Sequence, residues 1–377
     1  MRLIIYGDIG GSGGYVRYCK GLLGSNAILE NIEVWFICSQ PFYEILAPLD
    51  PEIKVITHPW MISKSRLHRY LWYLWVYPRL VRKIKPDVEF YPSGQLRVYL
   101  RKALTIATCH NLLLFDKKEL SRIENENEQV YFQRYRKNQV NSFEKSNAVI
   151  FLSRHSQSVV SKEVPAIKQS AVIAHGLDPV FLKAEKRSYQ LGNKIKLLYV
   201  SPFYHYKHQL EVVKSAQLLR EETGLDIYIS LIGGGNSSAA SELNNYVINE
   251  NIQSFVFVKG NMNYENLSGE YGAADIFIFA SSCETFGITI LEAMGAKLPI
   301  ACSDRTGLSE ILKDAGLYFN PEDPKSIADT VQKLILDINL RETLGERAYH
   351  YALDYTWKRC ASETFSYINT LKETDEK

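Results

Sequence analysis

The sequence predicts an α/β protein that consists of two successive units, each with a parallel β-sheet. Apolar runs of strand length alternate along the chain with segments of helix length, the pattern of such sheets. A polar, charged stretch at 183–194 interrupts this alternation and is typical of an interdomain linker, and the pattern restarts after it. The length of 377 residues fits two domains better than one.

The first unit is expected to hold five strands, at 3–6, 33–37, 105–108, 148–152 and 171–174. A helix should begin near Tyr15, and Ser153 is placed to cap another one. The second unit is expected to hold strands at 196–200, 226–232, 255–258, 276–279 and 300–302. The predicted domains are 1–186 and 187–356, and we expect the C-terminal segment 357–377 to pack back on the first domain.

Composition excludes several classes of protein. With 46% hydrophobic and 23% charged residues the chain is globular rather than disordered, and a net charge of +2 demands no nucleic-acid partner. The six cysteines lie far apart without a C-x-x-C pair, which predicts reduced thiols rather than disulfides or a zinc site. The N-terminus lacks a signal-peptide pattern, and no apolar run approaches the roughly 18 residues of a membrane span. We therefore expect a cytoplasmic protein.

A glycine-rich loop, residues 7–14 (GDIGGSGG), follows the first predicted strand. Such a loop lets backbone N–H groups approach a phosphate at the start of the next helix. The loop contains no G-x-G-x-x-G, no acid for a ribose follows the second strand, and a Walker A lysine is absent. A tight turn and a phosphate or substrate contact both remain open for this loop.

Two glutamates mark the end of the predicted strand 276–279. Glu284 lies in the loop after that strand, and Glu292 lies one turn into a helix that should start near Gly287 or Ile288. Ligands of open α/β sheets bind beyond the carboxyl ends of the strands, where the first N–H groups of this helix would point. A single acid there would most simply favour the helix dipole. Two carboxylates around a Phe-Gly turn instead suit the hydroxyl groups of a sugar and a ribose.

The segment from Glu284 to Glu292 resembles the Glu-x7-Glu motif of retaining glycosyltransferases of the GT-B fold, family 4 (glycosyl transferases group 1). Other landmarks of that family resemble this chain in the same order over nearly its whole length. They are Gly13-Gly14 with the following helix, His110-Asn111, 172–181, 197–201 with Lys207, 231–235, 270–275 and 307–310.

This resemblance implies two Rossmann-like domains that face each other across a cleft, with the acceptor on the N-terminal and a UDP- or GDP-sugar on the C-terminal domain. Glu284 would contact the transferred sugar, Glu292 the ribose, and Lys207 the diphosphate. His110 would line the reaction centre and position the acceptor or stabilise positive charge. Further donor contacts would come from Gly13, Gly14, Ser201, Phe286, Gly287, Ile288 and Thr289. The family uses neither a metal nor a cofactor here, and the chain contains no Asp-x-Asp pair.

One departure from the family concerns the grip on the diphosphate. Many relatives carry an arginine shortly before the lysine, whereas residues 201–208 contain none. Either Lys207 acts with His205 or a backbone donor, or the grip is weaker.

The reaction implied is hexosyl transfer with retention, by a front-face route in which the leaving phosphate assists the acceptor hydroxyl. The acceptor would be a saccharide or a lipid-linked saccharide in bacterial surface polysaccharide, lipopolysaccharide or O-antigen synthesis. A GT-B epimerase, a non-catalytic scaffold in a polysaccharide assembly complex and, remotely, a NAD-linked dehydrogenase are the alternatives. Loss of transfer in Glu284→Ala would separate the enzyme from the scaffold.

A basic aromatic segment lies between Glu52 and Asp87, where the chain has no acidic residue. Seven cations in 64–85 alternate with tyrosines and tryptophans, which suits the interface of an anionic membrane leaflet. The same segment contains aliphatic residues that read equally well as core. Peripheral membrane contact through 64–85 and a buried helix therefore remain alternatives, while nothing else supports binding of single-stranded nucleic acid.

Overall fold

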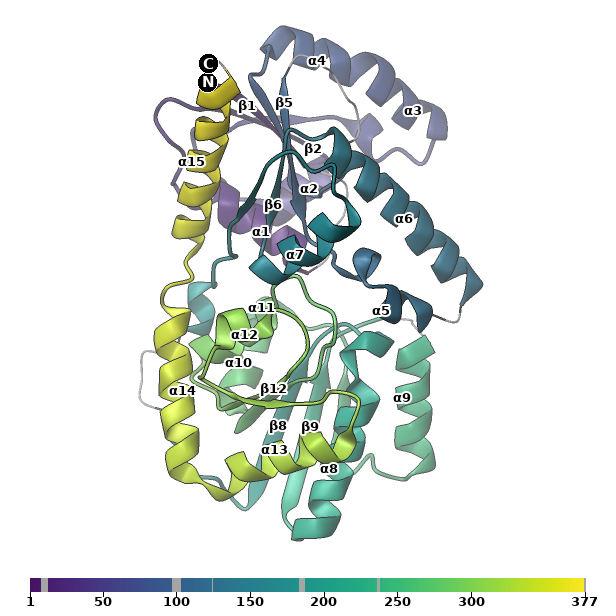
Figure 1. Cartoon of the computed structure of the whole chain (residues 1–377), viewed down its shortest axis with the longest axis vertical. Coiled ribbons are helices and arrows are strands. Elements are labelled where there is room, and N and C mark those ends of the chain that lie inside the picture. Colours follow the sequence, from purple (N-terminus) through teal and green to yellow (C-terminus); the bar gives the residue numbers. More distant parts are fainter. Residues whose placement is uncertain (8–12, 97–102, 124, 183–186, 236–237, 376–377) are drawn as a thin grey trace. The chain divides into compact units, whose positions relative to one another are not determined.

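The computed structural model describes residues 1–377 apart from 8–12, 97–102, 124, 183–186, 236–237 and 376–377. The chain divides into two compact units (Figure 1). Unit 1 comprises Met1–Phe115, Tyr131–Gly176 and Thr356–Lys377, and unit 2 comprises Asp116–Val130 and Leu177–Tyr355. The boundary expected after residue 186 lies outside the described residues, and the chain passes between the units at Gly176. A short segment of the first half, 116–130, belongs to unit 2.

Unit 1 is built on a seven-stranded, wholly parallel sheet in the order β3-β2-β1-β4-β5-β6-β7. Its strands are β1 (Arg2–Tyr6), β2 (Glu33–Cys38), β3 (Lys54–Thr57), β4 (Val88–Tyr91), β5 (Leu104–Cys109), β6 (Ala148–Phe151) and β7 (Ser170–Val172). The expectation of five strands was wrong, because β3 and β4 were missed. Each has only four residues, and β4 carries a glutamate, Glu89, at its second position.

The helices of unit 1 cover this sheet. They are α1 (Gly14–Leu23), α2 (Gln40–Leu46), η1 (Pro59–Met61), α3 (Arg66–Leu71), η2 (Trp72–Val76), α4 (Tyr77–Ile84), η3 (Leu113–Phe115), α6 (Glu126–Lys145), α7 (Arg154–Glu163) and α15 (Trp357–Asp375), with the start of α6 in unit 2. Ser153 caps α7 as predicted, because its Oγ accepts from the Ser156 amide and the Ser156 Oγ accepts from the Ser153 amide.

The last helix, α15, packs on α1 in the core of unit 1. The contact is close at Gly21, where an added Cβ would lie 2.0 Å from the indole of Trp357. Cys360, Phe365 and Ile368 of α15 are buried in the same core as the strands β1 and β2. The C-terminal segment is therefore part of the first unit's fold.

Unit 2 is built on a six-stranded parallel sheet in the order β10-β9-β8-β11-β12-β13. Its strands are β8 (Lys194–Val200), β9 (Asp226–Ile232), β10 (Val256–Lys259), β11 (Ile276–Phe279), β12 (Ile300–Ser303) and β13 (Leu317–Phe319). Five of these match the predicted strands. The sixth, β13, was missed because three residues are too few for a periodicity to show.

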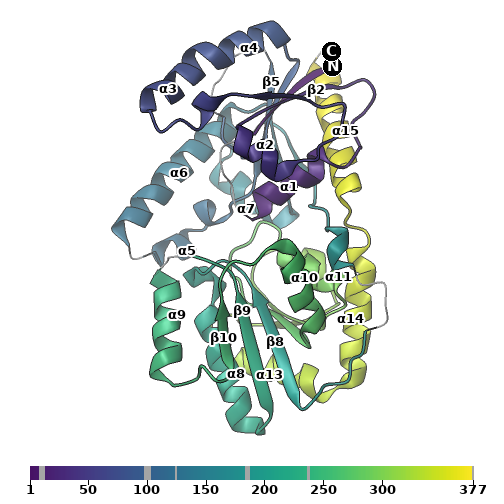
Figure 2. The same cartoon turned by 180° about the vertical axis from the view of Figure 1, so that it is seen from behind.

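Helices lie on both faces of this second sheet. Figure 1 shows α8 and α13 on one face, and Figure 2 shows α10 on the opposite face. The helices of unit 2 are α5 (Lys117–Ser121), η4 (Pro179–Phe181), η5 (His205–Lys207), α8 (Gln209–Thr223), α9 (Ser238–Asn249), α10 (Tyr264–Ala273), α11 (Ile288–Gly295), α12 (Leu308–Leu312), α13 (Pro324–Leu336) and α14 (Ile338–Ala352). Both sheets have the doubly wound order of a Rossmann-like domain.

The described part of the expected linker, 187–194, is mostly exposed, but two of its residues are held on unit 2. Tyr189 is buried, and its carbonyl accepts two hydrogen bonds from the Arg341 guanidinium at 2.9 and 3.0 Å. Arg187 donates to the backbone carbonyls of Ala274 and Ala296. Arg187 and Tyr189 are thus bound to unit 2 by arginine–carbonyl hydrogen bonds, which local composition does not reveal.

All six cysteines are buried and none forms a disulfide. Within the part of the chain that the structure describes, no helix is both long enough and apolar enough to cross a bilayer.

Candidate functional site

The strand order of unit 2 places a topological switch point between β8 and β11. The connection from β8 leads to β9 on one side, and the connection from β11 leads to β12 on the other. The loops that leave the carboxyl ends of β8 and β11 therefore diverge, and ligands of open α/β sheets bind in the crevice between such loops. These two loops carry Ser201, Lys207 and Glu284, which the sequence singled out.

Lys207 and Glu284 meet at this point. The Lys207 Nζ donates a hydrogen bond to Glu284 Oε1 and forms an ion pair with it. The Lys207 side chain is 8% exposed and that of Glu284 16%. The ammonium also lies 4.9 Å from the centre of the Tyr206 ring and 5.7 Å from that of Phe279. Two residues that the sequence placed in separate motifs thus form one partly buried, charge-balanced pair.

The N-terminus of α11 lies directly after the Glu284 loop. Gly287 precedes it with φ of +87°, in the left-handed region that favours glycine, and an added Cβ would lie 2.6 Å from Leu308 Cδ2. No side chain caps the first turn of α11. Its first N–H groups and the positive end of its dipole can therefore act on an anion. Phe286 is buried, and Ile288 and Thr289 are half-buried.

Glu292 lies one turn into α11, as predicted, but it is fully buried. The Tyr271 hydroxyl lies 2.8 Å from its Oε2 and the Tyr264 hydroxyl 3.4 Å from its Oε1, and both donate. The two glutamates of the motif thus have different surroundings: Glu284 pairs with a cation, and Glu292 is held by tyrosines of α10. The contact between Glu292 and a ribose stays a prediction.

The loop after β8 is held against the glycine loop after β9. Ser201 is buried, and its Oγ accepts a hydrogen bond of 2.9 Å from Gln209 Nε2. An added Cβ at Gly233 would lie 1.9 Å from the Ser201 carbonyl oxygen, so this close approach requires glycine. His205 points to α9, with its Nε2 2.9 Å from Ser238 Oγ. The side chain paired with Lys207 is therefore Glu284, and His205 bonds elsewhere.

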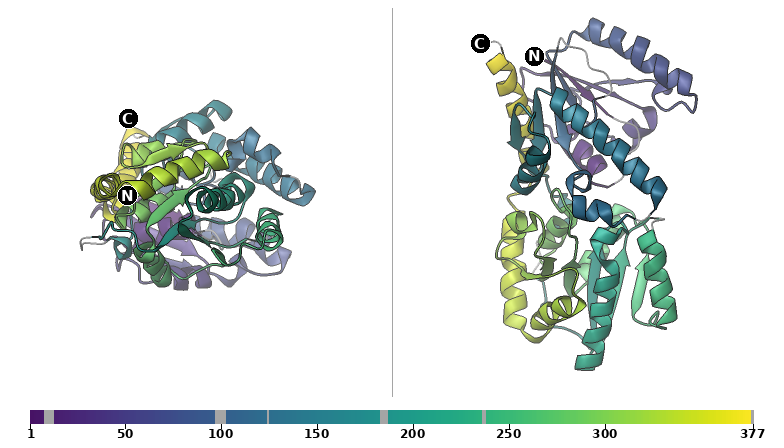
Figure 3. Two further views of the ribbon diagram at one scale, coloured as in Figure 1. Left: turned by 90° about the horizontal axis from the view of Figure 1, so that it is seen from below. Right: turned by 45° about the vertical axis from the view of Figure 1, so that its right-hand side comes forward.

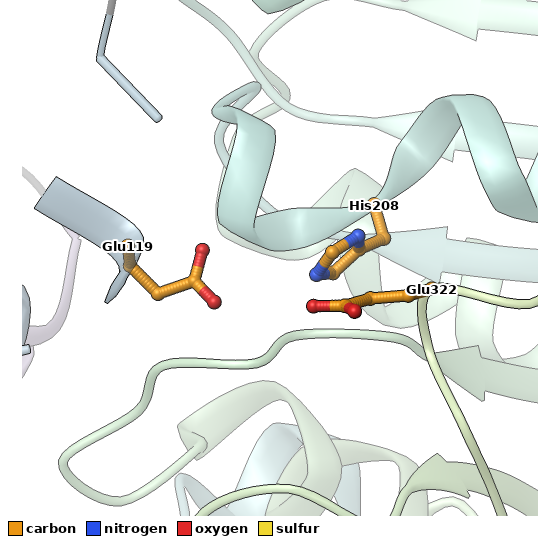
Figure 4. Close-up of side chains that lie close together, drawn as sticks. All are labelled: Glu119, His208 and Glu322. Atoms are coloured by element: carbon orange, nitrogen blue, oxygen red, sulfur yellow. The ribbon is translucent and has the colours of Figure 1, made fainter. Parts of the chain in front are cut away.

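A network of ionic and hydrogen-bonding side chains that the sequence did not indicate lies next to Lys207 in the chain, at His208. It joins His208 to Ser282 and Glu119. Glu119 of α5 accepts a hydrogen bond of 2.9 Å from Ser282 Oγ, which in turn lies 2.9 Å from His208 Nε2. Figure 4 shows the carboxylates of Glu119 and Glu322 turned toward His208. Ser282 lies two residues before Glu284 in the sequence, and His208 directly follows Lys207. The network is therefore hydrogen-bonded to both loops of the switch point.

Among the described residues, Glu119, His208 and Glu322 are the group whose potential metal-ligand atoms lie within 4.8 Å of one another. The carboxylates already have cationic partners. Arg122 pairs with both glutamates, at 3.3 Å from Glu119, and Lys118 Nζ lies 2.6 Å from Glu322. Hydrogen bonding to Lys118 lowers the pKa of Glu322 to about 2. A metal ion would have to compete with two side-chain cations, so the group fits an ionic network better than a metal site.

His110 of unit 1 follows β5 directly and lies in a cluster of rings. Its ring centre is 5.0 Å from that of Tyr18 and 5.5 Å from that of His175, and His175 stacks on Tyr18 at 5.3 Å. Burial lowers the pKa of His110 to about 4, and burial, with repulsion from His110 and Arg17, holds the pKa of His175 well below its usual range. Both imidazoles are therefore uncharged at neutral pH.

Gly14 lies beside this cluster, and Gly13 precedes it at the start of α1. Gly13 has φ of +68° before α1, and an added Cβ at Gly14 would lie 4.0 Å from His175 Cε1. Residues 8–12 of the glycine loop lie outside the described residues. His175 was missed as a site residue, although it comes three residues after β7. Parallel strands end at the same sheet edge, and that rule could have paired it with His110.

Residues 183–351 match the family model described as Glycosyl transferases group 1. This stretch, which is less than half of the chain, is similar to that family. Solved structures of similar fold cover nearly the whole chain. They include sucrose-phosphate synthase from Thermosynechococcus elongatus, with a TM-score of 0.75, 18% identity and 99% of each chain covered. Anabaena HepE in complex with UDP and glucose has a TM-score of 0.72 and 15% identity, with 98% of this chain and 100% of that chain covered.

At these identities the structural likeness establishes the fold alone, which is the predicted GT-B fold of two Rossmann-like domains. Among curated relatives, O-antigen chain mannosyltransferase B of Escherichia coli is 30% identical over 186 residues, 49% of this chain and 48% of that protein. D-inositol 3-phosphate glycosyltransferase of Paenarthrobacter aurescens is 24% identical over 171 residues, 45% of this chain and 42% of that protein. The matched stretch thus spans less than half the length of these relatives.

Proposed function

We propose that this protein is a retaining glycosyltransferase that moves a sugar from a nucleoside-diphosphate donor to a saccharide or lipid-linked saccharide acceptor. The observation that carries the proposal is the Lys207–Glu284 pair beside the uncapped N-terminus of α11, at the switch point of unit 2. The group 1 assignment of residues 183–351 supports it. A cation and helix amides suit a diphosphate, and a carboxylate suits sugar hydroxyls.

The donor would lie along the two loops of the switch point. Lys207 and the first amides of α11 would stabilise the diphosphate, which gains negative charge as it leaves. Glu284 would accept hydrogen bonds from the transferred sugar, and Glu292 would contact the ribose. Ser201, Phe286, Ile288 and Thr289 would complete the donor contacts, with Gly287 admitting the backbone close to the ligand.

The chemical step we propose is a front-face substitution. The bond between the anomeric carbon and the β-phosphate oxygen breaks while the acceptor oxygen bonds to the same face of that carbon. The acceptor proton passes to the departing phosphate oxygen, so the configuration is retained and no metal ion takes part. On unit 1, His110 would contact the acceptor or the reacting sugar. Its pKa of about 4 leaves it uncharged, so it would not repel the positive charge that develops on the sugar.

The setting we propose is synthesis of a bacterial surface polysaccharide. One relative is named an O-antigen chain mannosyltransferase, and a solved structure of the same fold holds UDP and glucose. The two names point to different sugars. Both UDP- and GDP-sugars therefore belong in the first test.

That test is a donor screen. Purified protein is incubated with a panel of UDP- and GDP-sugars in the presence of a chelator, and release of free nucleoside diphosphate is followed. We expect slow hydrolysis of one donor, which is lost in Glu284→Ala. Glu250→Ala serves as the matched control, because Glu250 is an exposed acid of the same unit outside the site. Release that needs an added metal ion would contradict the metal-independent step.

Thermal melting with UDP and GDP separates the remaining outcomes. A melting shift without release means that the acceptor is required, and the screen is repeated with saccharide acceptors. The absence of any shift with either nucleotide, in both the wild type and Glu284→Gln, would refute the donor site and favour the non-catalytic scaffold.

A further inference from the structure

Residues 66–84 form one continuous helix along the edge of unit 1, made of α3, η2 and α4 (Figures 1 and 3). One face of it is anchored on the sheet, where Trp72 Nε1 donates to the Tyr6 hydroxyl at 3.0 Å and the Tyr77 hydroxyl donates to Glu89 at 2.8 Å. Trp72 and Tyr77 are five residues apart, and an α-helix would separate them. The π-helical turn of η2 keeps both on the buried face.

The opposite face carries large apolar side chains that the rest of unit 1 leaves uncovered. Leu67 is 62% exposed, Tyr70 61%, Leu74 50% and Trp75 57%. Leu67, Tyr70 and Leu74 follow one another at spacings of three and four residues, so they lie on one side of the helix. A helix buried on one side would normally present polar residues on the other.

The same segment also carries seven exposed cations: Lys64, Arg66, Arg69, Arg79, Arg82, Lys83 and Lys85. No acidic residue lies between Glu52 and Asp87 in the sequence. Among the described residues none of the seven forms an ion pair with a carboxylate. Arg79 instead lies over the exposed Trp75 ring, 5.0 Å from its centre. The segment thus combines uncompensated positive charge with exposed apolar and aromatic groups.

We propose that this outer face, defined as Leu67, Tyr70, Leu74, Trp75 and the seven cations, docks on an anionic lipid bilayer. Lipid phosphates would supply the negative charge that the protein does not. The leucines would enter the acyl boundary, and Tyr70 and Trp75 would lie at the headgroup level, where amphipathic rings are stable. Binding is peripheral, through a helix whose other face stays on the sheet. The inference is independent of the proposed reaction, because it needs neither donor nor acceptor.

Vesicle binding tests the proposal. The full chain is sedimented with vesicles of phosphatidylglycerol and phosphatidylcholine, and with vesicles of phosphatidylcholine alone. We expect binding to the anionic vesicles that weakens as salt is raised, because salt screens the exposed cations. Equal binding to both vesicle types, or none to the anionic ones, overturns the proposal.

Two sets of variants locate the surface. Replacing Arg79, Arg82 and Lys83 together by glutamine should weaken binding about 100-fold, at about fivefold for each cation removed. Its control replaces three exposed lysines elsewhere, Lys162, Lys168 and Lys333. Leu67→Ser with Leu74→Ser should also weaken binding, whereas Ile248→Ser with Leu336→Ser, 59% and 73% exposed in unit 2, should not. Equal loss in a control set contradicts the assignment.

Tryptophan emission gives a readout that does not depend on sedimentation. Trp75 is 57% exposed and Trp72 is fully buried, so insertion should shift the emission of Trp75 to the blue. The shift should disappear in Trp75→Phe while that variant keeps its melting temperature. A shift that persists in Trp75→Phe would place the contact elsewhere on the protein.

Discussion

Removal of Lys207 should destabilise unit 2 even when no donor is present. Lys207→Met keeps a similar length of side chain but leaves the Glu284 carboxylate, 16% exposed, without its cation. Loss of one partner of a fully buried ion pair costs about 3–5 kcal/mol. Since Glu284 retains some contact with water, we expect the free energy of unfolding to fall by about 2.5 kcal/mol.

The partner variant and the double variant complete a thermodynamic cycle. Glu284→Gln leaves the ammonium over the rings of Tyr206 and Phe279, which still attract it, so we expect a loss of about 1 kcal/mol. The double variant carries no unpaired charge and should lose only about 1.5 kcal/mol, although both substitutions are present. The coupling energy between the two side chains is then about 2 kcal/mol.

The positions of the tryptophans make the assay specific for one unit. All five tryptophans lie in segments assigned to unit 1. Urea unfolding followed by tryptophan fluorescence therefore reports unit 1, and far-ultraviolet circular dichroism reports both units. We expect Lys207→Met to lower the midpoint seen by circular dichroism more than that seen by fluorescence. A loss below about 0.5 kcal/mol, or a double variant as unstable as the sum of the single ones, would refute a stabilising pair.

Three further variants probe the surroundings of the pair and the core of unit 1. Gly287→Ala should lower the free energy of unfolding by about 2 kcal/mol and weaken donor binding, because φ is +87° and the new Cβ would lie 2.6 Å from Leu308. Thermal melting with and without nucleotide measures both effects. Glu119→Gln removes a charge-assisted acceptor from Ser282 and should lower donor turnover, with Glu119→Asp recovering part of it; unchanged turnover would contradict a positioning role. Burial raises the pKa of Glu89, so the folded wild type should lose stability as pH rises from about 4.3, the pKa of an unfolded-state glutamate, through the raised pKa of the folded state. Glu89→Gln should not show this loss. Urea midpoints at several pH values test the difference.

Much of the fold was predictable because each long strand carries its own apolar run. The strands that were missed show the limit of that signal. In β4 the charged Glu89 interrupts the run, yet it is fully buried because the hydroxyls of Tyr77 and Tyr91 donate to its Oε2 at 2.8 and 2.6 Å. Tyr77 is twelve residues away on a helix, so the partner that makes the burial tolerable is not local.

The basic aromatic segment shows a second limit. The sequence left a core helix and a membrane-facing helix open as alternatives, and the structure shows one buried and one exposed face. A regular 3.6-residue period does not separate the two faces, because the π-helical turn at Trp72–Val76 shifts their phase. The buried face is now assigned, and docking of the outer face is our proposal.

The sequence indicated the candidate site residues one by one, but it did not indicate which of them pair. Lys207 and Glu284 were each expected near a donor, 77 residues apart, and they meet because β8 and β11 are neighbours in the sheet. Glu119 had no signal at all. It lies in the five-residue helix α5, in a segment of the first half of the chain that belongs to unit 2.

The charges at this edge have a consequence for donor binding. Lys207 balances Glu284, and Arg122 and Lys118 balance Glu119 and Glu322, so these ionic groups leave no excess positive charge for a diphosphate. A donor must therefore break the ion pair between Lys207 and Glu284. Binding stays favourable only if the sugar hydroxyls then donate hydrogen bonds to Glu284. A free nucleoside diphosphate has no sugar to offer in exchange. Glu284→Gln should accordingly bind UDP or GDP more tightly than the wild type while transfer is lost, and weaker binding of the nucleotide by this variant would contradict the exchange.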